Sequence, residues 1–427
     1  MNLVRQTLEN GLRVVVLELP HVHSVELGLF VKAGPRFEDT RTLGISHFTE
    51  HMLFKGTRSR PGTFRLHADV ERLGSPINAL TSRDYCQYYF HLPARNLERA
   101  TELFADIMQH PAFDNIDTER QIIVEEHLGD LNEAGEDITP ESHSRALLWP
   151  DSPLGLNILG TRANILRFNR QDLLNHHQKH YTGHNCVLYF AGAVTAAQSL
   201  LLAKRFFGSL PPGEPLVVPR VVPLPQGPRF KFVDNEDSQA HLNLSFLTPP
   251  MGTPEHLTLA VLYNLLADGI SSRLQWHICE KLGMVYDLDA GLEGFFDTGV
   301  FDIDASVAHE RLVPLARELL SVLDGLRSTP VESDELQKAV DRYRMSYEFA
   351  LDSPGALASW MISSELYSPP ISVEACMAHM DALTPQHLQA LARQMFQPGR
   401  MVMVVSGHPT RQEKQRLMKL IDTFGKG

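Results

Sequence analysis

The sequence has few cysteines, and none of them are paired at the spacing of a metal or redox motif. Four occur in 427 residues, and they are scattered: Cys86, Cys186, Cys279 and Cys376. Disulfide scaffolds and thiolate zinc sites carry more cysteines, in closer pairs. The sequence therefore predicts a fold stabilised by its core in a reducing compartment.

Long apolar runs are also absent, because charged residues interrupt every hydrophobic stretch before it could cross a bilayer. The opening residues, MNLVRQTLENGLRVVVLELP, have neither the apolar core nor the small-residue cleavage site of a signal peptide. We expect instead a strand over Leu12–Leu19. These features predict a cytoplasmic protein without a membrane span.

Positive charge is in deficit, with 39 Lys and Arg against 51 Asp and Glu, giving a formal charge of −12. Nucleic-acid binders usually carry a basic surface that displaces counterions, so a nucleic-acid partner is not expected. The 43% hydrophobic and 21% charged fractions are typical of a globular protein. A chain of 427 residues is longer than one hydrophobic core usually supports, so we expect two or more domains.

Proline is concentrated in GSLPPGEPLVVPRVVPLPQGP, residues 208–228, which holds seven of them. Such a segment cannot form a central strand or a helix interior, so it is the best linker in the chain. The same order of strand, turn, acidic loop and apolar helix occurs on both sides of it. We predict domains at residues 1–210 and 229–427, joined by a linker at 211–228.

Hydrophobic periodicity predicts an α+β fold. The expected elements of the first half are strands at Leu12–Leu19, Val25–Val31, Gln87–Leu92 and Cys186–Val194, with helices at Leu97–Gln109 and Thr118–Leu131. Those of the second half are strands at Phe230–Val233, His241–Leu247, Val300–Val307 and Met401–Val405, with a helix near Leu257–Ala267.

The stretch GISHFTEHMLFKGT, residues 44–57, places two histidines four residues apart, with a glutamate just before the second. Its apolar spacing predicts a helix over Leu43–Lys55, on which His47 and His51 share one face and Glu50 lies beside them. Catalytic zinc keeps three protein ligands and an open position for a water whose pKa falls to about 7. We predict a zinc site in which Glu50 takes the proton of that water and delivers it to a leaving amine.

A third ligand must come from another segment. In DTERQIIVEEHLGDL, residues 117–131, Glu119 and Glu126 are seven residues apart and share a helical stripe. We predict that Glu126 is the third ligand. Glu119 would then be a carboxylate that orients a ligand or the water.

Histidine is common in this chain, with 20 residues, so the pattern also arises by chance and a histidine-rich surface helix is the alternative interpretation. His176 and His180 in NHHQKH have the same spacing, but no glutamate accompanies them and Lys179 would repel a cation. We expect a solvated helix face there. His21 and His23 are expected to be exposed at a turn.

HFTEHMLFKGT, INALTSRDYCQYY and TERQIIVEEH together resemble the inverted-motif zinc metallopeptidases, the family of pitrilysin, insulysin and mitochondrial processing peptidase. The resemblance covers nearly the whole chain and is to a short, half-length member. It implies two homologous α/β sandwich domains, each a mainly antiparallel sheet covered by helices. It also implies that His47, His51 and Glu126 hold one zinc ion per chain, with Glu50 as general base and Glu119 as accessory carboxylate.

The resemblance further implies residues that contact the substrate. Asn78 and Ala79 would lie on an edge strand that receives the peptide by strand addition; the alternative for Asn78 is a turn before the strand. Tyr286 would reach the substrate or the developing oxyanion, and its alternative is a core tyrosine. Seven residues before Tyr286 the family has an arginine, and here Cys279 stands instead, which cannot replace a planar cation.

These observations predict a zinc-dependent endopeptidase that cuts short, unstructured peptides inside a chamber formed by a dimer. Because Cys279 replaces the arginine, we expect a homologous partner chain in a heterodimer, with a homodimer as the alternative. One alternative function is a dedicated processing peptidase for a single precursor, such as a presequence or a peptide or cofactor precursor. The other is a non-catalytic partner subunit, which the intact set of four zinc-site residues disfavours.

Overall fold

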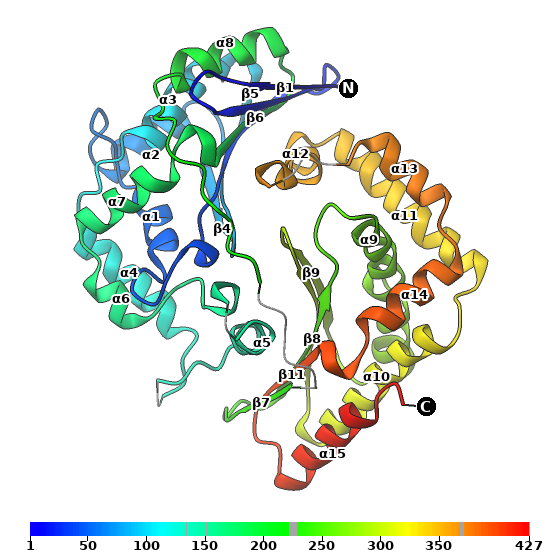
Figure 1. The fold of residues 1–427 in the computed structure, drawn as a ribbon. Coiled ribbons are helices and arrows are strands. Elements are labelled where there is room, and N and C mark those ends of the chain that lie inside the picture. The colour runs from blue at the N-terminus through cyan, green and yellow to red at the C-terminus, as the bar shows by residue number, and fades with distance from the viewer. Residues whose placement is uncertain (134, 151, 222–228, 368–370, 427) are drawn as a thin grey trace. The chain divides into compact units, whose positions relative to one another are not determined.

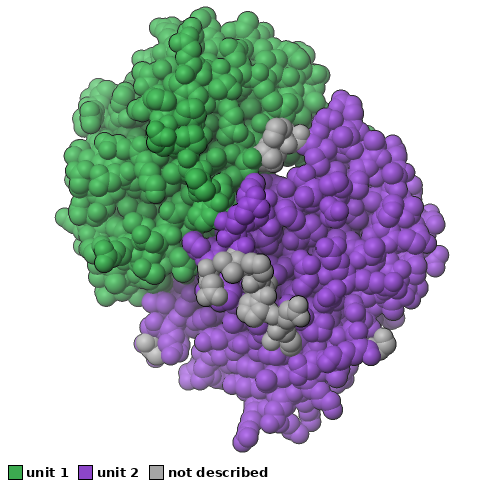
Figure 2. All heavy atoms as spheres, in the orientation of Figure 1, with its two compact units in different colours: residues 1–129, 156–219, 347–370 green, residues 130–155, 220–346, 371–427 purple. Residues whose placement is uncertain are grey.

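A computed structural model describes residues 1–133, 135–150, 152–221, 229–367 and 371–426 (Figure 1). The chain forms two compact units, coloured separately in Figure 2. The first unit comprises Met1–Gly129, Leu156–Pro219 and Tyr347–Pro370. The second comprises Asp130–Gly155, Arg220–Ser346 and Ile371–Gly427.

The first unit is built on a six-stranded sheet in the order β1-β2-β6-β3-β5-β4. Only β2 and β6 pair in parallel, and the other neighbours are antiparallel. The strands are β1 (Asn2–Thr7), β2 (Arg13–Glu18), β3 (Ser24–Val31), β4 (Ile77–Thr81), β5 (Cys86–Pro93) and β6 (Cys186–Gly192). The apolar runs expected at β2, β3, β5 and β6 are thus strands, whereas β1 was not expected.

Helices cover both faces of this sheet, as Figure 1 shows: α12 packs on β3 and β6, and the other helices of the unit lie on the opposite face. This explains why β3 and β6 are buried along nearly their whole length and read as continuous apolar runs. The helices are α1 (Ile45–Leu53), α2 (Thr63–Glu71), α3 (Leu97–Gln109), α4 (Ile116–Leu128), α6 (Arg162–Arg167), α7 (Arg170–His180), α8 (Ala196–Phe207) and α12 (Pro354–Ile362).

The second unit has a five-stranded sheet in the order β7-β11-β8-β10-β9. The strands are β7 (Arg229–Val233), β8 (Ala240–Thr248), β9 (Leu288–Gly294), β10 (Gly299–Val307) and β11 (Met401–Ser406). The helices are α5 (Pro140–Leu148), α9 (Pro254–Ala267), α10 (Leu312–Ser328), α13 (Val373–Asp381), α14 (Pro385–Met395), α15 (Arg411–Thr423) and the π-helical segment η5 (Gln275–Lys281), with α11 (Ser333–Leu351) running from this unit into the first.

The two sheets repeat one topology. Strands β2-β6-β3-β5-β4 of the first correspond in order to β7-β11-β8-β10-β9 of the second. In each of these sets of five strands the first pair is parallel and the remaining pairs are antiparallel. The predicted fold class, two α/β sandwich domains with mainly antiparallel sheets, is confirmed.

The units differ from the expected sequential division at residue 210, because two segments belong to the unit of the other half. Helix α5 precedes the linker but packs on β8 and β11, and its Arg145 forms a buried double hydrogen bond with Asp302 of β10 (2.9 and 2.6 Å). Conversely, α12 follows the linker but packs on the first sheet, next to Glu365, which pairs with Arg5. Each sheet buries its second face only because a distant helix reaches it.

Of the proline-rich segment, residues 211–221 form neither helix nor strand, and residues 222–228 lie outside the described part of the chain. Among the described residues, no helix is both long and apolar enough to cross a membrane.

Candidate metal centre

Helix α1 begins at a tight backbone contact. Gly44 precedes it with φ 92°, and a side chain at this position would meet the carbonyl oxygen of Leu159 at 2.6 Å. The first backbone N–H groups of the helix are capped by Glu38, whose carboxylate accepts from Gly44 N (2.8 Å) and Ser46 N (2.9 Å). Glu38 was not among the residues predicted from the sequence. Its only signal was an acidic residue in the loop before a helix.

Helix α7 supports α1, and here one expectation is wrong. His176, His177 and His180 are buried rather than solvated. His176 Nε2 lies 3.4 Å from the Ser46 hydroxyl of α1, and His180 Nδ1 lies 2.6 Å from the carbonyl oxygen of Lys32. Burial lowers the pKa of His180 to about 4. These rings are therefore neutral hydrogen-bonding core residues. His21 and His23, in contrast, are exposed as expected.

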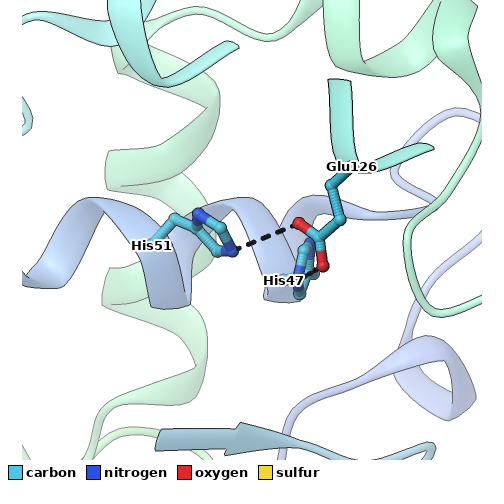
Figure 3. Close-up of side chains that lie close together, drawn as sticks. All are labelled: His47, His51 and Glu126. Carbon is cyan, nitrogen blue, oxygen red and sulfur yellow. Dashed lines mark ion pairs between the residues drawn. The ribbon is translucent and has the colours of Figure 1, made fainter. Parts of the chain in front are cut away.

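Three predicted ligands converge between α1 and α4. His47 Nε2 lies 3.7 Å from Glu126 Oε1, and His51 Nε2 lies 3.6 Å from Glu126 Oε2. Figure 3 shows the carboxylate of Glu126 turned toward both imidazoles. One ligand atom from each residue lies within 4.8 Å of the others. The two turns of α1 and one turn of α4 thus place three donor atoms around one point.

This donor set fits zinc. Two atoms that are each about 2.0–2.1 Å from a tetrahedral ion lie roughly 3.3 Å apart, so the separations of 3.6 and 3.7 Å need only a small contraction. Both separations are too long for hydrogen bonds. Two imidazoles and one carboxylate form a three-ligand set of the catalytic kind, which leaves a fourth position open. Glu126 is the most exposed of the three residues, so the cluster is open to solvent on its Glu126 side.

Glu119 contacts the ring nitrogen of His51 that lies away from Glu126. Its Oε1 lies 2.8 Å from His51 Nδ1, and its Oε2 lies 2.7 Å from Lys55 Nζ. The residue is only 3% exposed. Burial alone would raise the pKa of Glu119, but His51 and Lys55 together lower it below the ordinary value. An ionised Glu119 accepts from His51 Nδ1–H, which leaves Nε2 of that ring as the ligand atom.

The two histidines differ in protonation. Burial, with the nearby His51 second, lowers the pKa of His47 to about 3, so this ring is neutral at physiological pH. Burial alone would also lower the pKa of His51, but the hydrogen bond to Glu119 and the surrounding carboxylates raise it. His47 is thus a neutral imidazole, whereas the carboxylates around His51 favour its charged form. Metal binding at His51 therefore competes with a proton.

Glu50 is held by Thr81, which lies in the stretch INALTSRDYCQYY but was not predicted to have a role. The hydroxyl of Thr81, the last residue of β4, donates a hydrogen bond to Glu50 Oε2. Burial raises the pKa of Glu50, while this hydrogen bond opposes the rise. The carboxylate therefore lies beside the histidine pair. It is positioned both by its own helix, α1, and by a hydrogen bond from strand β4.

Strand β4, which carries Asn78 and Ala79, is an edge strand of the first sheet. It pairs with β5 on one side, through Asn78 with Tyr89 and Ala79 with Tyr88. The alternative for Asn78, a turn before the strand, is therefore wrong. The role of both residues in receiving a peptide stays a prediction.

Tyr286 and Cys279 belong to the second unit. The Tyr286 side chain is fully exposed, so the alternative of a core tyrosine is wrong, while its contact with substrate stays a prediction. Cys279 lies in η5 and is partly buried. Burial, with Asp287 and Glu280, raises the pKa of its thiol, so Cys279 is not an activated nucleophile.

A three-ligand cluster with a separately held carboxylate beside it is the arrangement of a metal-dependent hydrolase. Two family models match the chain: "Insulinase (Peptidase family M16)" over residues 13–162, and "Peptidase M16 inactive domain" over residues 167–343. The protein belongs to the insulinase family of peptidases, M16. The histidine pair of α1 lies within the first match, residues 13–162, and the second match carries the description of an inactive domain.

Relatives support this assignment over most of their length. An uncharacterized zinc protease of Rickettsia bellii is 33% identical over 351 residues, covering 80% of this chain and 82% of the relative. One of Mycobacterium bovis is 30% identical over 398 residues, covering 92% and 90%. The crystal structure of a protease from Helicobacter pylori has the same fold, with a TM-score of 0.86 at 22% identity, covering 95% of this chain and 99% of that one.

Proposed function

We propose that this protein is a zinc-dependent endopeptidase that cuts short, unstructured peptides and binds one zinc ion per chain. The observation that carries the proposal is the convergence of His47, His51 and Glu126, with Glu50 held beside them. The names of the relatives, zinc proteases, support the same reaction class. When bound, zinc supplies a Lewis acid and lowers the pKa of water at its open position.

Glu50 supplies the proton transfer. One of its oxygens accepts from Thr81, and the other accepts no hydrogen bond from the described residues. The second oxygen can therefore take a proton from the attacking water and return it to the amine of the leaving peptide. The raised pKa of Glu50 favours this exchange, because a base that is too acidic returns the proton poorly.

The substrate binds as an extended chain in this proposal. Strand β4 is at the edge of its sheet, and its last residue contacts the general base. An edge strand offers unpaired backbone groups to a peptide that has no secondary structure of its own. A peptide paired with β4 next to Asn78 and Ala79 would be read through its main chain, so sequence preference would be broad. Compact folded proteins would resist cleavage.

The working form in this proposal is a dimer that encloses the peptide, with a homologous partner chain favoured over a second copy. The support is Cys279, which stands where the resemblance implies an arginine. Its raised pKa keeps it a neutral thiol, which cannot provide the charge or the planar donors of a guanidinium. A partner chain with the arginine would supply this group.

The test uses the purified full chain with a fluorogenic peptide and metal analysis. Wild type should hold about one zinc per chain and cleave the peptide. Glu50→Gln should retain zinc and lose about a hundredfold to ten-thousandfold in rate, because the amide cannot accept the proton. His51→Ala should lose zinc and activity, whereas His23→Ala, an exposed histidine, should change neither. Stoichiometric zinc in His51→Ala would contradict the ligand assignment, and near wild-type cleavage by Glu50→Gln would exclude this base.

A further inference from the structure

Thr81 occupies a junction between the edge strand and the general base. It is the last residue of β4 and is buried. Its hydroxyl donates to Glu50 Oε2 and lies 3.5 Å from Cys86 Sγ, the residue opposite it on β5. A single hydroxyl thus contacts a group on α1 and a group on the neighbouring strand.

The three groups form a directed chain of hydrogen bonds. Burial raises the pKa of Cys86 strongly, so its sulfur keeps a proton to donate. The Thr81 hydroxyl can accept from this thiol while donating its own hydrogen to Glu50, because one hydroxyl is both donor and acceptor. The order is Cys86 S–H to Thr81 O–H to the Glu50 carboxylate. Acceptance from the thiol turns the hydroxyl hydrogen toward Glu50.

The backbone of β4 controls where this hydroxyl points. Threonine is branched at Cβ, so its χ1 angle has few accessible values and the oxygen position follows the strand. Thr81 is held in register by its pairing with Cys86. Glu50, by contrast, has a long side chain with several rotatable bonds. The stiffer residue therefore positions the more flexible one.

We propose that Thr81 is a positioning residue that fixes the general base, Glu50, relative to the edge strand β4. This inference rests on the proposed peptidase function. By holding Oε2, Thr81 leaves Oε1 as the oxygen that exchanges protons. Thr81 also ends the strand that is proposed to pair with the peptide. It would therefore fix the position of the base relative to the scissile bond.

The structure also predicts what Thr81 does not do. None of the predicted zinc ligands is among its hydrogen-bond partners. Replacing it should therefore affect the chemical step and leave zinc binding and substrate affinity largely intact. A group that only stabilised the fold would not produce this division, so kcat, KM and zinc content distinguish the two roles.

The experiment compares Thr81→Val, Thr81→Ser and Thr101→Val in the full-length, zinc-loaded protein. Valine keeps the shape and removes the hydroxyl, whereas serine keeps the hydroxyl. Thr101 is the matched control, because its buried hydroxyl donates to the carbonyl of Leu97 in α3 at 2.7 Å, away from the site. We expect Thr81→Val to lower kcat about tenfold to a hundredfold, the scale of a misplaced catalytic group, with KM and zinc content nearly unchanged.

Thr81→Ser should recover most of the lost kcat, and Thr101→Val should keep wild-type kcat even where its thermal stability falls. Wild-type kcat in Thr81→Val would overturn the inference. So would an inactive Thr81→Ser that is folded and zinc-loaded, or a loss of zinc in Thr81→Val, because either result makes the role structural. If wild type itself cleaves no peptide, the proposed function fails, which is a separate outcome.

Discussion

Removing the charge of Glu119 provides a quantitative test of the metal centre. Glu119 faces two donors, His51 Nδ1 at 2.8 Å and Lys55 Nζ at 2.7 Å. Glutamine in its place has one acceptor oxygen and one NH₂ group. One of the two donors would therefore face an amide NH₂ instead of an oxygen. Glu119→Gln should loosen the orientation of His51 without removing a ligand.

The expected magnitude follows from the position of Glu119 behind a ligand. Losing such a partner typically weakens metal binding tenfold to a hundredfold. This corresponds to about 1.4 to 2.7 kcal/mol of binding free energy. Glu119 is buried, so solvent cannot substitute for the lost oxygen, and the upper part of the range is expected. Cleavage at saturating zinc should be affected much less than by Glu50→Gln.

Titration of metal-free protein with zinc in the presence of a competing chelator measures this change. Glu125→Gln is the matched control, because it makes the same chemical change on an exposed position of the same helix, α4. Thermal unfolding of each metal-free variant shows whether the fold is intact. Zinc affinity equal to wild type in Glu119→Gln would refute the orienting role of this carboxylate.

Three further predictions concern stability and assembly. Arg145→Met should lower the free energy of unfolding by about 3–5 kcal/mol in urea titrations, because the buried Asp302 loses its cationic partner and keeps only the hydrogen bond from Ser245 among the described side chains; equal stability would contradict the role of the Arg145–Asp302 pair in docking α5. Burial raises the pKa of Glu38 to about 7, above its unfolded value, so its contribution to stability is complete below about pH 4.5 and is lost as the pH rises through 7. Urea titrations between pH 5 and 8 should show this loss in wild type and not in Glu38→Gln, and identical slopes would exclude it. The peptidase rate of the chain should rise by roughly a hundredfold in Cys279→Arg, or when a homologue that carries the arginine is added. If the chain alone is fully active and neither change raises its rate, the case for a heterodimer is removed.

Local sequence patterns did not predict which polar side chains are buried. NHHQKH was expected on a solvated face because no glutamate accompanies its histidines and Lys179 would repel a cation, yet His176, His177 and His180 are buried. Periodicity could not reveal this, because each ring finds a hydrogen-bond partner on a distant segment, such as Lys32 for His180 and Met108 for His177. Polar residues are buried when tertiary structure supplies such partners.

Helices α5 and α12 show that local sequence patterns also fail to predict which sheet a helix packs on. The proline-rich segment predicts a linker between two halves of the sequence, because proline cannot continue a strand or helix. It does not reveal that α5 packs on the second sheet and α12 on the first. These contacts depend on buried groups that are about 150 or more residues apart, such as Arg145 and Asp302, and no local pattern encodes such a pairing.

By itself, the sequence determined an α+β fold and the shared helical face of His47 and His51, because both depend on short-range periodicity; the two-sandwich architecture and the complete ligand set were implied by the family resemblance. A spacing of four on a helix places His47 and His51 on one face, and alternation or apolar runs mark the strands. Only the tertiary structure brought Glu126 to the histidines, placed Glu119 behind one of them and set Thr81 against Glu50. These contacts join α1 to α4 and to β4, and the packing that aligns separate elements is a property of the whole core, which no single segment contains.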